Sequence, residues 1–157
     1  MLIGEAPGSS EDLQGRPFVG AAGKFLETLL SGIGVSREEV FICNIVKCRP
    51  PGNRPPKPLE VQTCTPYLER QIKIIKPEFL VTLGSCSTEY IFSRAQFPFA
   101  GITAVRGKKH HATLHDVQMA IFPTFHPAAA LYSLKYKEQL IADFEVLRKE
   151  LGKIRNA

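Results

Sequence analysis

The chain has 157 residues, 44% of them hydrophobic and 22% charged, which is enough apolar material for the core of one globular domain and argues against disorder. Its 20 Lys and Arg and 15 Asp and Glu residues give a formal net charge of +5, a modest excess that permits a polyanionic partner without requiring one. No stretch has the apolar length of a membrane span and none resembles a signal peptide, so we expect a cytoplasmic protein that does not bind a membrane.

The first predicted element is a strand at Leu2-Ile3, which runs into a bend at residues 4–8, GEAPG. Two glycines and a proline let such a bend approach a ligand closely, although the same pattern also binds phosphate or serves only as a turn. The strand starts at the first residue, whereas strands usually have about five or six residues. We therefore expect residues 1–157 to form a single domain that lacks an N-terminal segment.

Residues 9–20 are predicted to form a loop, and residues 21–32 a helix that Gly32 and Gly34 end. The apolar side of this helix contains Phe25, Leu26, Leu29, Leu30 and Ile33. Phe18 is an aromatic residue in the preceding glycine-flanked loop. It is suited to stacking on a nucleic-acid base, although loop aromatics more often fill a gap in the core.

Ser36 and Glu39 predict a short capping box, and residues 40–46, VFICNIV, have the β-branched and aromatic content of a buried strand. Asn44 is the polar exception in that strand. A buried amide needs partners for both its donor and its acceptor groups. Asn44 is therefore suited either to hydrogen-bonding the edge of a pyrimidine or to tying down a neighbouring loop.

A proline-rich loop at residues 48–58 leads to a predicted helix at about 59–75, which Pro77 ends. Four cations lie in or beside this loop: Lys47, Arg49, Arg54 and Lys57. A stiff basic loop is suited to phosphate binding, although a run of charges is also typical of a solvated surface. Residues 79–83 are a third predicted strand, after which Gly84 turns the chain into a short helix.

Residues 102–105 and 117–125 are predicted strands on either side of a polar, basic loop at 106–115. The last helix has a core-facing stripe formed by Leu140, Phe144, Leu147, Leu151 and Ile154. Strands that alternate with helices predict a doubly wound α/β fold with three layers, αβα, around a central, mostly parallel four-stranded sheet.

His126 follows the last predicted strand and precedes Pro127, so its ring is expected to point into a cleft. Because the carboxyl ends of parallel strands share one edge of a sheet, we expect Glu5 and His126 to meet at that edge. An imidazole beside a carboxylate can donate a hydrogen bond to a developing anion, although a lone histidine is more often structural.

Four motifs stand in order along the chain: GEAPG at 4–8, GRPFVG at 15–20, NIVKCRPPGNR at 44–54 and FHPA at 125–128. Together they resemble the family 4 uracil-DNA glycosylases, the thermostable iron–sulfur type, over about residues 2–131. The resemblance implies an enzyme of base excision repair. Such an enzyme hydrolyses the N-glycosidic bond of a flipped-out deoxyuridine, in single- or double-stranded DNA, and leaves an abasic site.

The resemblance also implies a role for each motif residue. Phe18 would stack on the flipped uracil, Asn44 would hydrogen-bond its Watson–Crick edge, and the backbone around Ala6 would contact it. His126 would stabilise the leaving base, and Glu5 would orient the attacking water.

Four further residues have implied roles outside the core of the site. Glu11 would crowd the 5-methyl group of thymine and so exclude that base, although it could also be a surface carboxylate without a functional role. Leu131 would be the minor-groove wedge, and Arg49 and Arg54 would contact DNA. The arginine that often follows the wedge is absent, since Tyr132 and Ser133 stand there.

The family binds a 4Fe–4S cluster through four cysteines, two of them in a Cys-x-x-Cys pair before the first strand. Only Cys48 and Cys64 match, so they would form half of a site, while Cys43 and Cys86 match no ligand. Either the chain starts late or the cluster is lost, and we favour the late start because two thiols at cluster spacing suggest metal rather than a disulfide.

Two alternatives stand beside the enzyme. One is a noncatalytic DNA-binding domain of the same fold, against which the intact Glu5, Phe18, Asn44 and His126 argue. The other is a fragment that is unstable and inactive despite its motifs. We expect the protein to be a monomer with uracil-containing DNA as its partner.

Overall fold

A computed structural model describes the backbone of residues 1–155 and the side chains of residues 1–152. A five-stranded sheet forms its centre, in the order β2-β1-β3-β5-β4. The first four strands in that order pair in parallel, and β4 pairs antiparallel with β5. The strands are β1 (Leu2–Gly4), β2 (Ile42–Asn44), β3 (Phe79–Leu83), β4 (His110–Leu114) and β5 (Val117–Thr124).

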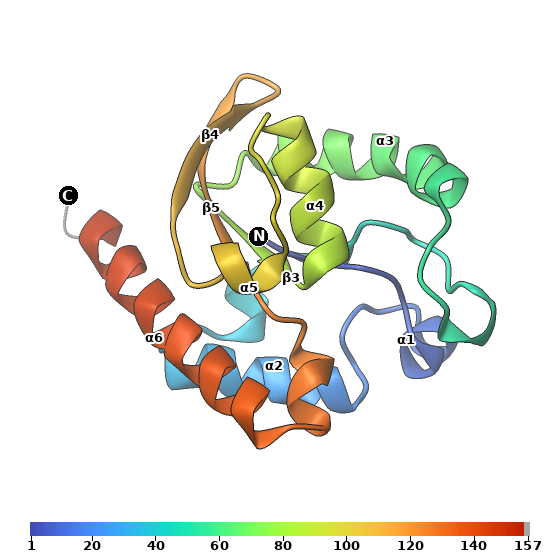
Figure 1. The fold of residues 1–157 in the computed structure, drawn as a ribbon, viewed down its shortest axis with the longest axis horizontal. Coiled ribbons are helices and arrows are strands. Elements are labelled where there is room, and N and C mark those ends of the chain that lie inside the picture. The colour runs from blue at the N-terminus through green and yellow to red at the C-terminus, as the bar shows by residue number, and fades with distance from the viewer. Residues whose placement is uncertain (156–157) are drawn as a thin grey trace.

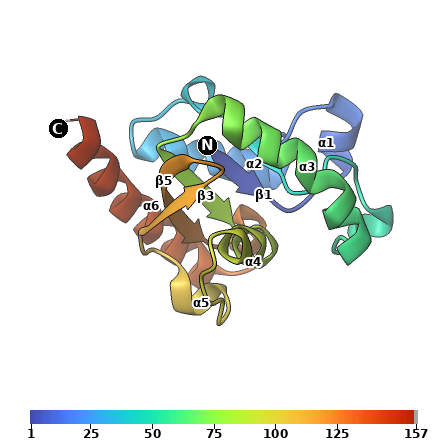
Figure 2. The same cartoon turned by 90° about the horizontal axis from the view of Figure 1, so that it is seen from above.

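Helices cover both faces of this sheet (Figures 1 and 2). They are α1 (Ser9–Gln14), α2 (Ala21–Gly32), α3 (Pro58–Ile75), α4 (Ser85–Arg94), α5 (Ile102–Val105) and α6 (Leu134–Arg155), with short 3₁₀ helices η1 (Arg37–Glu39), η2 (Pro51–Asn53) and η3 (Pro127–Leu131). In both views α1 lies at the end of the molecule away from the C-terminus.

Two hydrophobic clusters, one on each face of the sheet, make the fold a three-layer sandwich. Alternate residues of β3 point to opposite faces, so Val81 packs with α2 and α6 while Leu80 packs with α3 and α4. The first cluster contains Leu26 and Phe144, and the second contains Ile72. The predicted α/β class with αβα layers is therefore confirmed.

Several predicted elements agree closely with the structure. The helix at 21–32 and the strand at 79–83 have the predicted bounds, and α3 begins one residue earlier than predicted. The capping box is present, since Glu39 accepts a hydrogen bond of 2.7 Å from the Ser36 N–H. In α6 the predicted core stripe is buried at Leu140, Phe144 and Leu147, and Leu151 packs against it, while the side chain of Ile154 lies outside the described part.

The predicted strand count was wrong because part of the predicted loop at 106–115 is β4, the fifth strand. A two-residue hairpin turn at His115 and Asp116, both with positive φ, folds this segment back on β5. Its first four residues alternate between half-buried and exposed and only Leu114 is buried, so its polarity suggested a loop.

Two further local predictions were wrong, and a third was right about the element but not about its length. Residues 102–105 form one turn of helix, in which the Arg106 N–H donates to Ile102 O at 2.9 Å, although β-branched residues there suggested a strand. The predicted loop at 9–20 contains α1, whose first turn is capped by Glu11 through the Gly8 N–H. The predicted strand at 40–46 is present but shorter, as β2, and the Ile45 and Val46 N–H groups extend its backbone hydrogen bonds to Gly4 and Glu5.

A buried ion pair fixes the end of β5. The Arg106 guanidinium donates to both carboxylate oxygens of Asp143, at 3.0 and 2.7 Å, and the Thr124 hydroxyl donates to the same carboxylate at 2.6 Å. Asp143 is buried and lies on α6, so this contact joins the last helix to the strand that precedes His126.

Among the described helices, none is both long and apolar enough to cross a membrane.

We expect Asp143→Ala to lower the free energy of unfolding by about 3 kcal/mol, because it leaves a mostly buried guanidinium and the Thr124 hydroxyl without their acceptor. Arg148→Ala is the matched control, since it removes an exposed pair with Glu145 and should cost less than about 0.5 kcal/mol. Urea unfolding monitored by circular dichroism measures both. Equal losses in the two variants would contradict the role given to Asp143.

Candidate functional site

The carboxyl ends of the parallel strands bring the motif residues of distant segments to one edge of the sheet. Asn44 ends β2, the GEAPG bend follows β1, and His126 stands two residues after β5. A cavity of about 300 Å³ opens at this edge, and we call it the His126 cavity. Its lining includes Ala6, Glu11, Phe18, Asn44, Arg54 and His126.

The structure therefore brings together six of the residues predicted for the site. It does not bring Glu5 into the cavity lining, although the neighbouring Ala6 is there. Arg49, Leu131 and the two matched cysteines also lie outside it. Glu5 and His126 thus lie at the same edge of the sheet, as predicted, but Glu5 does not join His126 in the cavity wall.

His126 is neutral and oriented. Its Nδ1 accepts a hydrogen bond of 3.1 Å from the Ala128 N–H, so the ring proton is assigned to Nε2. Burial lowers the pKa of His126 to about 4, with the charge of Glu11 acting weakly in the opposite direction. At neutral pH the ring is therefore a neutral hydrogen-bond donor.

Phe18 packs against this imidazole, with ring centroids 5.4 Å apart and ring planes 28° from parallel. Its side chain is buried, and its backbone has φ +52°, in the left-handed region. Glycine at position 4 permits the packing, because a Cβ there would lie 2.7 Å from the Phe18 ring and 2.5 Å from Asn44 Oδ1. Gly4 thus sets how closely the ring and the amide approach each other.

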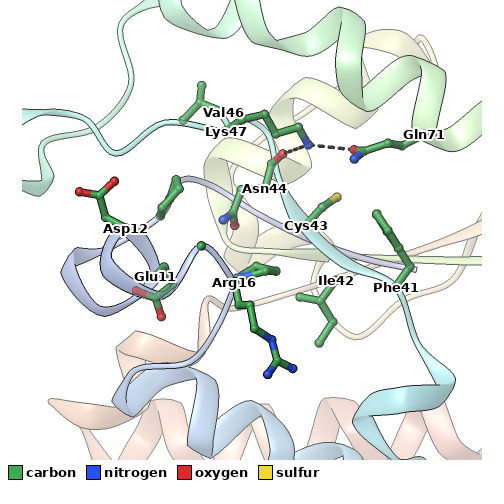
Figure 3. Close-up of a pocket in the computed structure, with 13 residues that line it drawn as sticks. Glu11, Asp12, Arg16, Phe41, Ile42, Cys43, Asn44, Val46, Lys47 and Gln71 are labelled. Carbon is green, nitrogen blue, oxygen red and sulfur yellow. Dashed lines mark hydrogen bonds between the residues drawn. The ribbon is translucent and has the colours of Figure 1, made fainter.

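Asn44 is buried at the end of β2, where its backbone oxygen accepts a hydrogen bond of 2.8 Å from Lys47 Nζ. Lys47 also donates to Gln71 on α3, as Figure 3 shows. Among the described residues no group hydrogen-bonds to the side-chain amide of Asn44. The fold therefore secures the backbone at this position while leaving the amide available to a ligand.

Figure 3 shows a second cavity, of about 380 Å³, at the open edge of β2. It shares Pro7, Glu11 and Asn44 with the His126 cavity, and its remaining lining includes Arg16, Phe41 and Lys47. Since neither Phe18 nor His126 lines it, it lacks both rings of the candidate site.

The Glu11 carboxylate accepts hydrogen bonds from backbone N–H groups. One oxygen accepts hydrogen bonds from the Val19 and Gly20 N–H groups, at 2.9 and 2.8 Å, and the other accepts from Gly8 at 3.2 Å. Burial acts to raise the pKa of Glu11, but these hydrogen bonds outweigh it and the pKa is lowered. Glu11 is therefore an ionised link between the GEAPG bend and the loop that carries Phe18.

Glu5 is half-buried beside Cys86, at the start of α4. Burial raises the pKa of Glu5, and its hydrogen bond with the Cys86 thiol acts in the opposite direction. Burial and the nearby Glu5 charge raise the pKa of Cys86 to about 12, so the thiol stays protonated and donates to the carboxylate. This pairing gave no signal in the sequence.

The basic loop is ordered by its own contacts. Arg54 donates to both oxygens of Glu60, at 2.8 and 2.7 Å, which lowers the pKa of Glu60 to about 2. Arg49 donates through Nε to Asn53 at 2.7 Å.

Leu131, at the end of η3, is 47% exposed, and the adjacent Tyr132 is 89% exposed.

Cys48 and Cys64 line a third cavity, of about 310 Å³, between the basic loop and α3. Cys64 Sγ accepts a hydrogen bond of 3.5 Å from the Lys47 N–H. Cys43 is buried in β2 and Cys86 adjoins Glu5, so neither shares this cavity. Among the described residues no group of three or more His, Cys, Asp or Glu is arranged to bind a metal ion. The two thiols supply half of what a four-thiolate cluster needs, so these residues alone do not fit the whole group.

Comparison with known proteins matches residues 1–147 to the family model of the uracil DNA glycosylase superfamily. The chain is 51% identical over 150 residues to a type-4 uracil-DNA glycosylase of Sulfurisphaera tokodaii, an alignment that covers 95% of this chain and 68% of the relative. A type-4 enzyme of Saccharolobus solfataricus is 48% identical, with 97% of this chain and 71% of the relative covered.

A third relative, the type-4 uracil-DNA glycosylase of Archaeoglobus fulgidus, is 42% identical over 98% of this chain and 77% of its own length. These alignments confirm the resemblance that was based on four motifs, and they extend it over nearly the whole sequence. The family model agrees with them. The chain therefore belongs to the uracil-DNA glycosylase superfamily.

Proposed function

We propose that this protein excises uracil from DNA by hydrolysing the N-glycosidic bond of a flipped-out deoxyuridine. The observation that carries the proposal is the convergence of Phe18, Asn44 and His126 on one cavity of about 300 Å³. An aromatic ring, a carboxamide and a neutral imidazole donor are the groups needed to bind a pyrimidine and stabilise it as a leaving group.

Binding uses the first two groups. The flipped uracil stacks on Phe18, while the Asn44 amide offers one donor and one acceptor to its Watson–Crick edge. The backbone at Ala6 forms another part of the wall, and we propose that Glu11 excludes thymine by standing near the 5-position. Arg49, Arg54 and Leu131 are proposed to contact the DNA around the flipped nucleotide.

The bond-breaking step needs charge stabilisation. When the C1′–N1 bond breaks, its electron pair passes to the uracil, and the sugar gains positive character. The Nε2–H group of His126 donates to the oxygen on which that negative charge develops, so it stabilises the transition state more than the substrate. Water adds to C1′, and the proton that it releases neutralises the uracil anion, directly or through solvent. We propose that the Glu5 carboxylate orients this water.

The iron–sulfur assignment is a proposal that concerns Cys48 and Cys64 alone. Their shared cavity and the hydrogen bond to Cys64 support a role as two of the four thiolate ligands of a 4Fe–4S cluster. When bound, such a cluster would supply an ordered anchor for the basic loop. No catalytic step is derived through it.

Release of uracil from oligonucleotides with one deoxyuridine, single- or double-stranded, tests the function. We expect release by the wild-type protein and a loss of about 10²- to 10³-fold in kcat for His126→Gln, because the variant lacks the imidazole donor. His115→Gln, at the opposite end of β5, is the control and should keep wild-type activity. Folded wild-type protein that binds DNA without releasing uracil would instead favour the noncatalytic domain.

Stability should depend on pH through His126. The folded pKa of about 4 lies below the ordinary value of 6.5, so the unfolded chain takes up a proton first as the pH falls. Unfolding free energy should therefore decrease between pH 6.5 and 4, by up to about 3 kcal/mol from this group. Urea titrations at several pH values should show a smaller decrease in His126→Gln, and identical slopes would contradict the assignment.

Metal binding can be measured separately from activity. After anaerobic incubation with ferrous iron and sulfide, we expect Cys64→Ser to bind less iron than the wild-type chain, since it loses one proposed ligand. Cys86→Ser is the matched control, because Cys86 lies outside the cysteine-lined cavity, and should bind as the wild type does. Iron analysis and the visible absorption of the cluster give the result, and equal iron in all three proteins would contradict the assignment.

A further inference from the structure

The loop that carries Phe18 is held by two charged side chains of opposite sign. Arg37, on η1, donates through Nη1 to the Phe18 carbonyl at 2.7 Å and through Nη2 to the Pro17 carbonyl. Glu11, on α1, accepts from the two following backbone N–H groups. Charge-assisted hydrogen bonds thus fix the carbonyl groups of residues 17 and 18 and the N–H groups of residues 19 and 20.

Phe18 needs such support because its backbone conformation is unfavourable. A φ of +52° is rare for a bulky residue and persists only where the surrounding structure imposes it. Its carbonyl also points at α2, since a Cβ on Gly23 would lie 1.9 Å from that oxygen. The helix backbone therefore packs directly against this carbonyl. Arg37 supplies the hydrogen bond that the Phe18 carbonyl accepts there.

Arg37 is itself well placed to act as a fixed support. Its side chain is only 14% exposed, and Nη1 makes a second contact of 3.1 Å with Glu27 on α2. It belongs to η1, which ends shortly before β2, the strand that ends at Asn44. One residue therefore connects the Phe18 loop to the strand that carries the amide.

We propose that Arg37 is a positioning residue of the uracil site, which holds the Phe18 ring in the orientation that stacks on the flipped base. The proposal rests on the function proposed above. Arg37 does not line the His126 cavity, so its effect on the base passes through Phe18 rather than through contact with the substrate.

The test is a double-mutant cycle between Arg37→Met and Phe18→Ala on uracil-containing DNA. We expect Arg37→Met to reduce kcat/KM about tenfold in the wild-type background but less than about twofold in Phe18→Ala, where the ring is already missing. Affinity for DNA that contains an abasic site, which places no base in the cavity, should change less than about twofold. A purely structural role would instead lower activity equally in both backgrounds.

Glu27→Gln is the matched control, because it removes the charge partner on α2 and leaves both carbonyl hydrogen bonds of Arg37 in place. It should keep kcat/KM within about twofold of the wild type. Assays are run below the unfolding midpoint of every variant. If Arg37→Met does not fold, Arg37→Lys takes its place in the same cycle, with an intermediate loss expected because an ammonium lacks the guanidinium fork.

The outcomes separate this inference from the proposed function. A wild-type protein that releases uracil, together with an Arg37→Met variant within about twofold of it, overturns the positioning role and leaves the function intact. Equal losses in both backgrounds also overturn it. A folded wild-type protein that releases no uracil overturns the function itself.

Discussion

The candidate site depends on the close approach of three chain segments at Gly4. Gly4 pairs in register with Asn44 across β1 and β2, and its missing side chain leaves room for the Phe18 ring. Any larger residue would displace the amide, the ring or both. A backbone constraint in the sheet therefore sets the distance between the two groups that we propose to bind uracil, and the remaining groups are arranged around it.

Around that constraint, the protein uses charge to order the backbone and keeps the His126 donor neutral. Glu11 and Arg37 hold the loop of residues 17–20 from opposite sides, and Arg106 with Asp143 fixes the end of β5. His126 remains neutral because partial burial in the cavity wall lowers its pKa. A neutral donor suits a reaction that creates negative charge on the leaving base. The free enzyme then does not have to bury a positively charged imidazolium, which would be destabilising.

Much of this arrangement was determined by local sequence. The helix at 21–32 was predicted at its observed bounds because its apolar residues recur at helical spacing, and the strand at 79–83 because it is a short, nearly continuous apolar run. Asn44 was recognised because an amide inside an apolar strand needs hydrogen-bond partners, and His126 because it stands between an apolar strand and Pro127. Placing Glu5 and His126 at one sheet edge required only that their strands be parallel.

Only the tertiary structure decided the features that depend on partners distant in sequence. β4 is a strand because it pairs with β5, which its own polar residues do not indicate. Arg37 lies between the two residues of the predicted capping box and gave no signal of its own, and its hydrogen bonds to residues 17 and 18 form only when η1 packs beside that loop. Glu5 adjoins Cys86 rather than lining the cavity. Periodicity and motifs report what each segment prefers, whereas these contacts arise from segments that meet only after folding.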